Sequence, residues 1–157
     1  MEREKVKSIL AFYRDIDGEV ILAKRMLRDY EDTYYVGGNG GANLESYIKS
    51  RNKVSKPTEA AALNIPESAS AVMRDLRADV ERLAALKAAI LQELNKLPLQ
   101  QKSIVYDFYI QGLQWVQISA RVHYSPTRCK TIRNSGLDNL ARYFTKNDLI
   151  KNFNYPT

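Results

Sequence analysis

Residues 97–144, LPLQQKSIVYDFYIQGLQWVQISARVHYSPTRCKTIRNSGLDNLARYF, decide how the second part of this chain folds. The first stretch of this segment predicts a helix that is closed by Gly112, in the position that favours a left-handed C-cap. WVQISARV predicts a second, very short helix, and HYS predicts a turn. Ser125 is a good N-cap and Pro126 a good first helical residue, so a third helix is expected to begin there.

The spacing of small and apolar residues predicts that the second and third helices meet at a steep angle. Such a crossing needs a small residue where the backbones approach, and Ser119 occupies that position. It also needs apolar residues on both sides of the turn. These are expected to be Ile118, Val122, Tyr124, Cys129 and Ile132, with Ile104, Val105 and Phe108 pointing inward from the first helix. The pattern therefore predicts a helix-turn-helix unit over residues 99–144.

The outward face of the third helix is rich in basic and hydrogen-bonding side chains, and the stretch has no acidic residue before Asp138. Arg and Asn side chains on such a face are suited to bidentate contacts with guanine and adenine edges in the major groove. We therefore expect the protein to bind double-stranded DNA. The candidate contact residues are Arg121, Ser125, Thr127, Arg128, Lys130, Thr131, Arg133 and Asn134.

The distribution of charge agrees with a polyanionic partner for this segment. The chain has a net charge of +6. Residues 1–96 carry 16 Lys/Arg against 15 Asp/Glu, a balance of +1, whereas residues 97–157 carry 8 against 3, a balance of +5. The basic excess therefore lies almost wholly in the last third, where a surface facing phosphates would be useful.

Residues 97–144 resemble region four of bacterial sigma factors. The resemblance rests on the leading Leu-Pro, the Gly-Leu pair, a polar-aromatic helix start, an Ile followed by a small residue, and a Ser-capped recognition helix. With the long helices that precede it, the chain is similar to small phage-encoded regulators of the ArpU and RinA type. That resemblance implies an activator of late genes that acts with host RNA polymerase.

Three positions depart from the pattern of sigma region four. His123 replaces the usual turn glycine and would need a left-handed backbone. Gln114 replaces the Ser or Thr that normally caps the second helix, which predicts a weaker cap. Gly136 stands inside the recognition helix, where we expect close packing against the 99–111 helix.

Residues 1–96 predict a scaffold of two long helices. In the first, apolar residues recur at alternating spacings of three and four, a heptad pattern that runs from Val6 to Tyr30. Gly18 lies outside this row of apolar residues, the seam of the helix, and should weaken the helix by about 1 kcal/mol. A second helix is expected from Ser68 to Lys96. The two are expected to pair antiparallel, within one chain or between two chains of a homodimer.

No segment of the chain predicts a β-strand, so the expected fold class is all-α. Residues 32–67 include the glycine-rich sequence GGNGG, expected to be a loop, and SKPTEAAAL, expected to be a short helix. The recognition unit is expected to occupy residues 97–146, and residues 147–157 are expected to be a C-terminal tail.

The sequence indicates a binding protein rather than an enzyme. No catalytic constellation or nucleotide fingerprint stands out, and we expect no cofactor and no metal. Cys129 is the only cysteine and is expected to fill the core. No stretch suggests a membrane span or signal peptide, so a cytoplasmic location is expected. Two alternatives remain open: a DNA-packaging component similar to a small terminase subunit, and a polymerase-binding protein without DNA contact.

Overall fold

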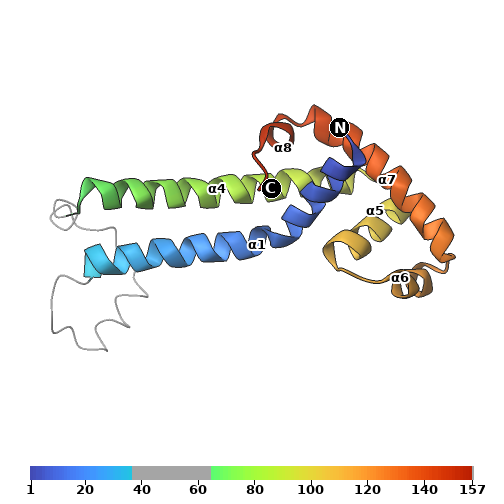
Figure 1. The fold of residues 1–157 in the computed structure, drawn as a ribbon, viewed down its shortest axis with the longest axis horizontal. Helices are drawn as coiled ribbons and strands as arrows, with labels where there is room; N and C mark the ends of the chain where they lie inside the picture. Colours follow the sequence, from blue (N-terminus) through green and yellow to red (C-terminus); the bar gives the residue numbers. More distant parts are fainter. Residues whose placement is uncertain (37–64, 157) are drawn as a thin grey trace. The chain divides into compact units, whose positions relative to one another are not determined.

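A computed structural model describes residues 1–36 and 65–156, and the secondary structure in these ranges is entirely helical (Figure 1). The all-α prediction is therefore confirmed for the described residues. The sequences GGNGG and SKPTEAAAL lie outside them. The elements are α1 (Arg3–Glu31), the π-helix η1 (Asp32–Val36), α4 (Glu67–Asn95), α5 (Leu99–Val105), the π-helix η2 (Tyr106–Ile110), α6 (Trp115–Val122), α7 (Pro126–Lys146) and α8 (Asp148–Asn152).

The chain divides into two compact units whose boundaries differ from the predicted division at residue 96. Unit 1 comprises Met1–Glu19 and Arg82–Thr157, and unit 2 comprises Val20–Glu81. Unit 1 is larger than the predicted recognition unit because the first part of α1 and the last part of α4 contribute to it. Arg3 of α1, for example, binds Asp138 of α7 through two hydrogen bonds of 2.6 and 2.7 Å.

The predicted seam of α1 is buried most completely in unit 1. Val6, Ile9 and Ile16 are fully buried there, and Tyr13 is 8% exposed. Within unit 2 the seam residues Val20, Leu27 and Tyr30 are only partly buried. The apolar side chains of α1 therefore lose more solvent contact in unit 1, where their burial contributes more to stability.

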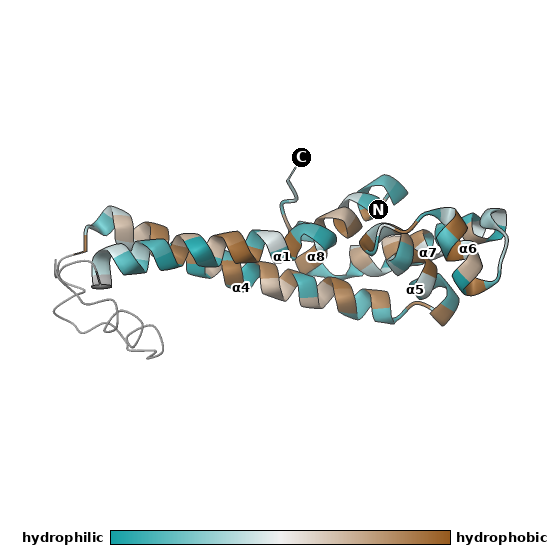
Figure 2. Cartoon of the chain, turned by 90° about the horizontal axis from the view of Figure 1, so that it is seen from below, coloured by the Kyte–Doolittle hydropathy of each residue, from teal (hydrophilic) through white to brown (hydrophobic). Residues whose placement is uncertain are grey.

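Contacts between α1 and α4 lie within the chain in each unit. In unit 1, Lys87 Nζ lies 2.5 Å from Asp17 Oδ1, and in unit 2, Arg77 Nη2 lies 3.0 Å from Glu31 Oε1. Bands of apolar and polar residues follow each other along both helices (Figure 2). Because both ion pairs are exposed, the buried apolar side chains contribute more to stability than these charges do.

The last residues of the chain are structured, which corrects the prediction of a tail at 147–157. Asn147 caps α8 by accepting a hydrogen bond from the backbone N–H of Ile150, which is fully buried. Beyond α8, the rings of Phe153 and Tyr155 lie 5.6 and 5.7 Å from the ring of Phe12 of α1. This packing could not be predicted from local sequence, because the partner of these rings is about 140 residues away in the chain.

Gly136 marks a close approach of α7 to α5, as predicted. A Cβ atom at this position would lie 3.0 Å from Val105 Cγ2 and 3.4 Å from Gln101 Cβ. Gly18 of α1 differs, because a Cβ atom there would meet nothing within 4 Å. The two glycines therefore form a natural comparison of one crowded and one open helical position.

Substitution of these glycines should change stability in opposite directions. Gly18→Ala should raise the free energy of unfolding by about 0.5–1 kcal/mol, because alanine lowers the entropy that the helix loses on folding. Gly136→Leu should lower it by about 1–3 kcal/mol, because the added side chain overpacks the contact with Val105. Urea unfolding followed by circular dichroism measures both. Wild-type stability of Gly136→Leu would contradict the close packing.

Candidate nucleic-acid interface

Residues 99–110, predicted to be part of one α-helix, form α5 followed by the wider turn η2. The backbone N–H of Gln111 donates to the carbonyl of Tyr106, five residues back, at 3.0 Å. Gly112 then adopts φ +70°, and Leu113 N–H donates to the carbonyl of Asp107 at 2.9 Å. Gly112 therefore closes this segment in the left-handed conformation that the sequence predicts.

Two side chains of α6 support its ends. The backbone N–H of Gln114 donates to Gln117 Oε1 at 2.9 Å, so the side chain of Gln117 satisfies a donor at the start of α6. His123 ends the helix with φ 61°, as predicted. The hydroxyl of Ser119 donates to the carbonyl of Tyr124 and so holds the turn from within. Ser119 therefore stabilises the turn by a hydrogen bond, in addition to being small where the helices cross.

The start of α7 follows the sequence prediction closely. Ser125 Oγ accepts a hydrogen bond of 3.2 Å from the backbone N–H of Arg128, and Pro126 is the first helical residue. Cys129 is fully buried with Ile104 and Ile118, so its role as a core residue is confirmed. Residues packed around this core are Phe108, Leu113, Trp115, Val122, Tyr124 and Ile132.

The eight candidate contact residues fall into two groups. One group is exposed on the first turns of α7 or at its cap: Ser125, Thr127, Arg128, Lys130 and Thr131. The other group is engaged with the protein: Arg121 has an ion-pair partner, and Arg133 and Asn134 are only partly exposed. Ser135, which the sequence analysis did not select, is exposed one turn beyond Thr131. Helical spacing of four residues would have indicated it.

Arg128 lies over an aromatic ring of the turn. Its guanidinium carbon is 4.3 Å from the centre of the Tyr124 ring, within the range of a cation–π interaction. The hydroxyl of Tyr124 accepts a hydrogen bond of 2.7 Å from Gln100 of α5. The ring beneath Arg128 is therefore held at its far end by another helix.

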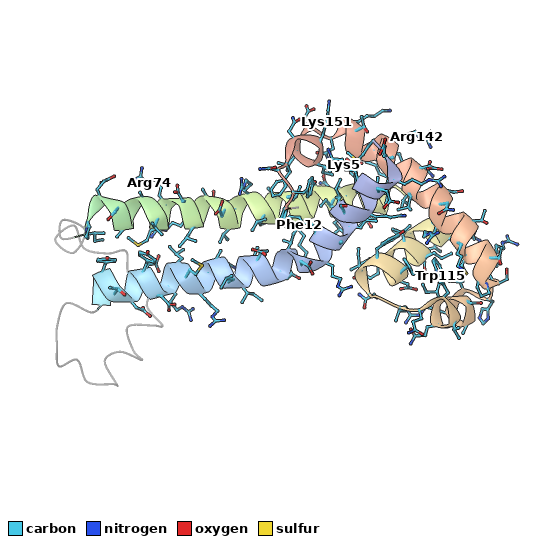
Figure 3. The ribbon with its side chains drawn as sticks, in the orientation of Figure 1. Lys5, Phe12, Arg74, Trp115, Arg142 and Lys151 are labelled. Atoms are coloured by element: carbon cyan, nitrogen blue, oxygen red, sulfur yellow. The ribbon has the colours of Figure 1, made fainter. Side chains whose placement is uncertain are left out.

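Arg133 lies against two stacked aromatic rings instead. The rings of Phe108 and Trp115 are 4.3 Å apart and nearly parallel, and Trp115 stands at the start of α6 (Figure 3). The guanidinium carbon of Arg133 is 5.0 Å from the centre of the Trp115 ring, and Lys130 Nζ is 5.8 Å from it. Arg133 Nε also donates to Asn134 Oδ1 at 3.2 Å. These contacts turn Arg133 toward the protein.

Arg121 forms an ion pair with a buried carboxylate. Its Nη1 lies 3.1 Å from Asp107 Oδ1, and the side chain of Asp107 is 7% exposed while that of Arg121 is 61% exposed. A buried carboxylate without a cation is costly, so this pair fastens α6 to η2. The sequence placed Arg121 among the DNA contacts, whereas the structure gives it a partner in the protein.

The described residues were compared with the requirements of a metal site and of a membrane-spanning helix. They contain no group of three or more His, Cys, Asp and Glu side chains that could hold a metal ion. No helix among residues 1–36 and 65–156 has both the length and the apolar character needed to cross a membrane. Comparisons with protein families, with curated proteins and with solved structures find no match for this chain.

Removal of Arg121 should destabilise the fold. Arg121→Ala should lower the free energy of unfolding by about 1–3 kcal/mol, because it leaves the buried carboxylate of Asp107 unpaired. In an Asp107→Asn background the same change should cost much less, since a neutral amide needs no cation. Urea unfolding of the four proteins in this cycle measures the coupling. Equal costs in both backgrounds would contradict a role for the ion pair.

Proposed function

We propose that the protein is a sequence-specific DNA-binding regulator of transcription in which α6, residues 123–125 and α7 act as a helix-turn-helix. The observation that carries the proposal is the exposed face at the start of α7. Arg128, Lys130, Thr127 and Thr131 are all exposed there, on a helix whose N-terminus is capped by Ser125. A recognition helix reads base edges with residues of this kind near its N-terminus.

The electrostatics of α7 support the same proposal. Asp138 is the only acidic residue of the helix, and it lies seven residues beyond Thr131, the last residue of the exposed face. Arg3 holds both oxygens of its carboxylate, and this contact holds the pKa of Asp138 below its ordinary value. The negative charge is thereby compensated within the protein, so α7 presents no uncompensated anion to a phosphate backbone.

The proposed partners and the setting rest on the sequence. The likeness of residues 97–144 to region four of bacterial sigma factors favours a phage or prophage late-gene activator that works with host RNA polymerase in the cytoplasm. A homodimer would supply two recognition helices, with half-sites about one DNA turn apart or a multiple of that. In unit 2, α1 exposes Ile21, Leu22 and Met26, which suits an interface with a second copy.

Charge reversal on α7 tests DNA binding directly. Arg128→Glu combined with Lys130→Glu should weaken binding to a selected duplex on the order of 100-fold or more, because two phosphate- or base-facing cations become anions. The matched control is Lys24→Glu combined with Arg28→Glu, which makes the same change in net charge on exposed positions of α1. Fluorescence anisotropy with duplexes enriched from a random pool measures both variants.

The outcomes of this experiment separate the candidate functions. Loss of binding in the α7 variant alone supports the recognition helix, and equal loss in both variants indicates an effect of net charge. Undiminished binding in the α7 variant would overturn the proposal. Binding by a large ring without sequence preference would favour a packaging component, and a wild-type protein that binds polymerase but no DNA would favour an interaction protein.

Salt should weaken the complex steeply. The logarithm of the association constant should fall linearly with the logarithm of salt concentration, because counterions leave the DNA when phosphates are neutralised. Lys130→Ala should make the slope shallower by about 1 if Lys130 contacts a phosphate. Arg121→Ala should leave the slope unchanged, since Asp107 already neutralises this side chain. A complex insensitive to salt would contradict the proposal.

A further inference from the structure

We propose that Arg128 reads a guanine in the DNA site and that Tyr124 is the residue that positions it. The inference rests on the proposed function and assigns different roles to the arginines of the α6–α7 region. Arg128 determines specificity, whereas Arg121 and Arg133 hold the unit together. Tyr124 itself contacts no base and acts through Arg128.

The surroundings of the three arginines differ in the way that this division requires. Arg121 is paired with the buried carboxylate of Asp107, and Arg133 lies on Trp115 and shares a hydrogen bond with Asn134. Arg128 is exposed, and within the described part of the chain its guanidinium has no ion-pair partner. Its donors are therefore available to a ligand, whereas Arg121 Nη1 and Arg133 Nε already bind the side chains of Asp107 and Asn134.

Arg128 is exposed, which leaves these donors accessible while the ring of Tyr124 supports the guanidinium. A guanidinium that lies over an aromatic ring uses its flat face, whereas its five N–H groups point outward from its edge. Two of those donors match the O6 and N7 acceptors of guanine in the major groove. A side chain already held on a ring also loses less conformational entropy when it binds. The 4.3 Å contact thus favours one orientation of Arg128 before DNA arrives.

Tyr124 is itself held from several sides, which makes it a firm support. Its hydroxyl accepts from Gln100 at 2.7 Å, and its carbonyl accepts the hydroxyl of Ser119. Its ring also packs against the core that contains Cys129. Three elements, α5, α6 and α7, therefore fix the position of the ring under Arg128.

The test uses the full chain and the duplex most enriched from a random pool. Each guanine is replaced in turn by 7-deazaguanine, which lacks the N7 acceptor. For the wild type, one replacement should weaken binding about 10- to 100-fold. Arg128→Ala removes all the guanidinium donors, so it should bind the natural duplex more weakly and be insensitive to that replacement. Tyr124→Leu should behave in the same way.

Two conservative variants separate positioning from folding. Tyr124→Phe keeps the ring and loses the hydrogen bond to Gln100, so it should retain most of the sensitivity to 7-deazaguanine. Gln100→Ala should match it, because it removes the same hydrogen bond. Affinity for a duplex of unrelated sequence should stay within about threefold of the wild type in the three variants that keep Arg128, since phosphate contacts dominate such binding. A protein that merely unfolds would lose both kinds of binding.

Failure of the inference can be told from failure of the proposed function. A wild-type protein that binds no duplex overturns both. A wild-type protein that binds a specific duplex with no dependence on any guanine N7 overturns the role of Arg128 alone. If Tyr124→Leu keeps the full sensitivity to 7-deazaguanine, Tyr124 does not position Arg128. If Tyr124→Leu does not fold, retained sensitivity in Arg128→Ala still overturns the inference.

Discussion

The conformation of the turn between α6 and α7 is the constraint on which the proposed site depends. His123 takes a left-handed backbone, and the hydroxyl of Ser119 binds the carbonyl of Tyr124 within the same turn. Together they place the ring of Tyr124 against the core on one side and beneath Arg128 on the other. A small error in this turn would therefore displace both the first residues of α7 and the cation that they present.

The orientation of α7 depends on a second constraint farther along the helix. At Gly136 the absence of a side chain lets α7 approach Val105 and Gln101 of α5, and two residues later Arg3 of α1 binds Asp138. The first contact sets how closely the helices cross, and the second compensates the one acidic side chain of α7. Both contacts lie at or beyond the middle of α7, so the exposed Arg128 and Lys130 near its N-terminus are not used in them.

Much of the candidate site could be predicted from the sequence because its determinants are local. The cap at Ser125 and the left-handed residues Gly112 and His123 each depend on backbone preferences of a few neighbouring residues. The engagement of Arg121 by Asp107 could not be predicted in the same way. That contact joins residues 14 apart through the unexpected π-turn of η2, which directs the carboxylate inward.

The sequence was enough to predict the two long helices, α6, α7 with its cap at Ser125 and the concentration of positive charge near the C-terminus, since periodicity, capping residues and composition are properties of short segments. Only the tertiary structure decided which basic side chains are free and which are engaged. Arg121, Arg128 and Arg133 look alike in the sequence, yet one is paired, one is exposed on Tyr124 and one lies on Trp115. Their partners come from other elements, and only folding brings those elements together.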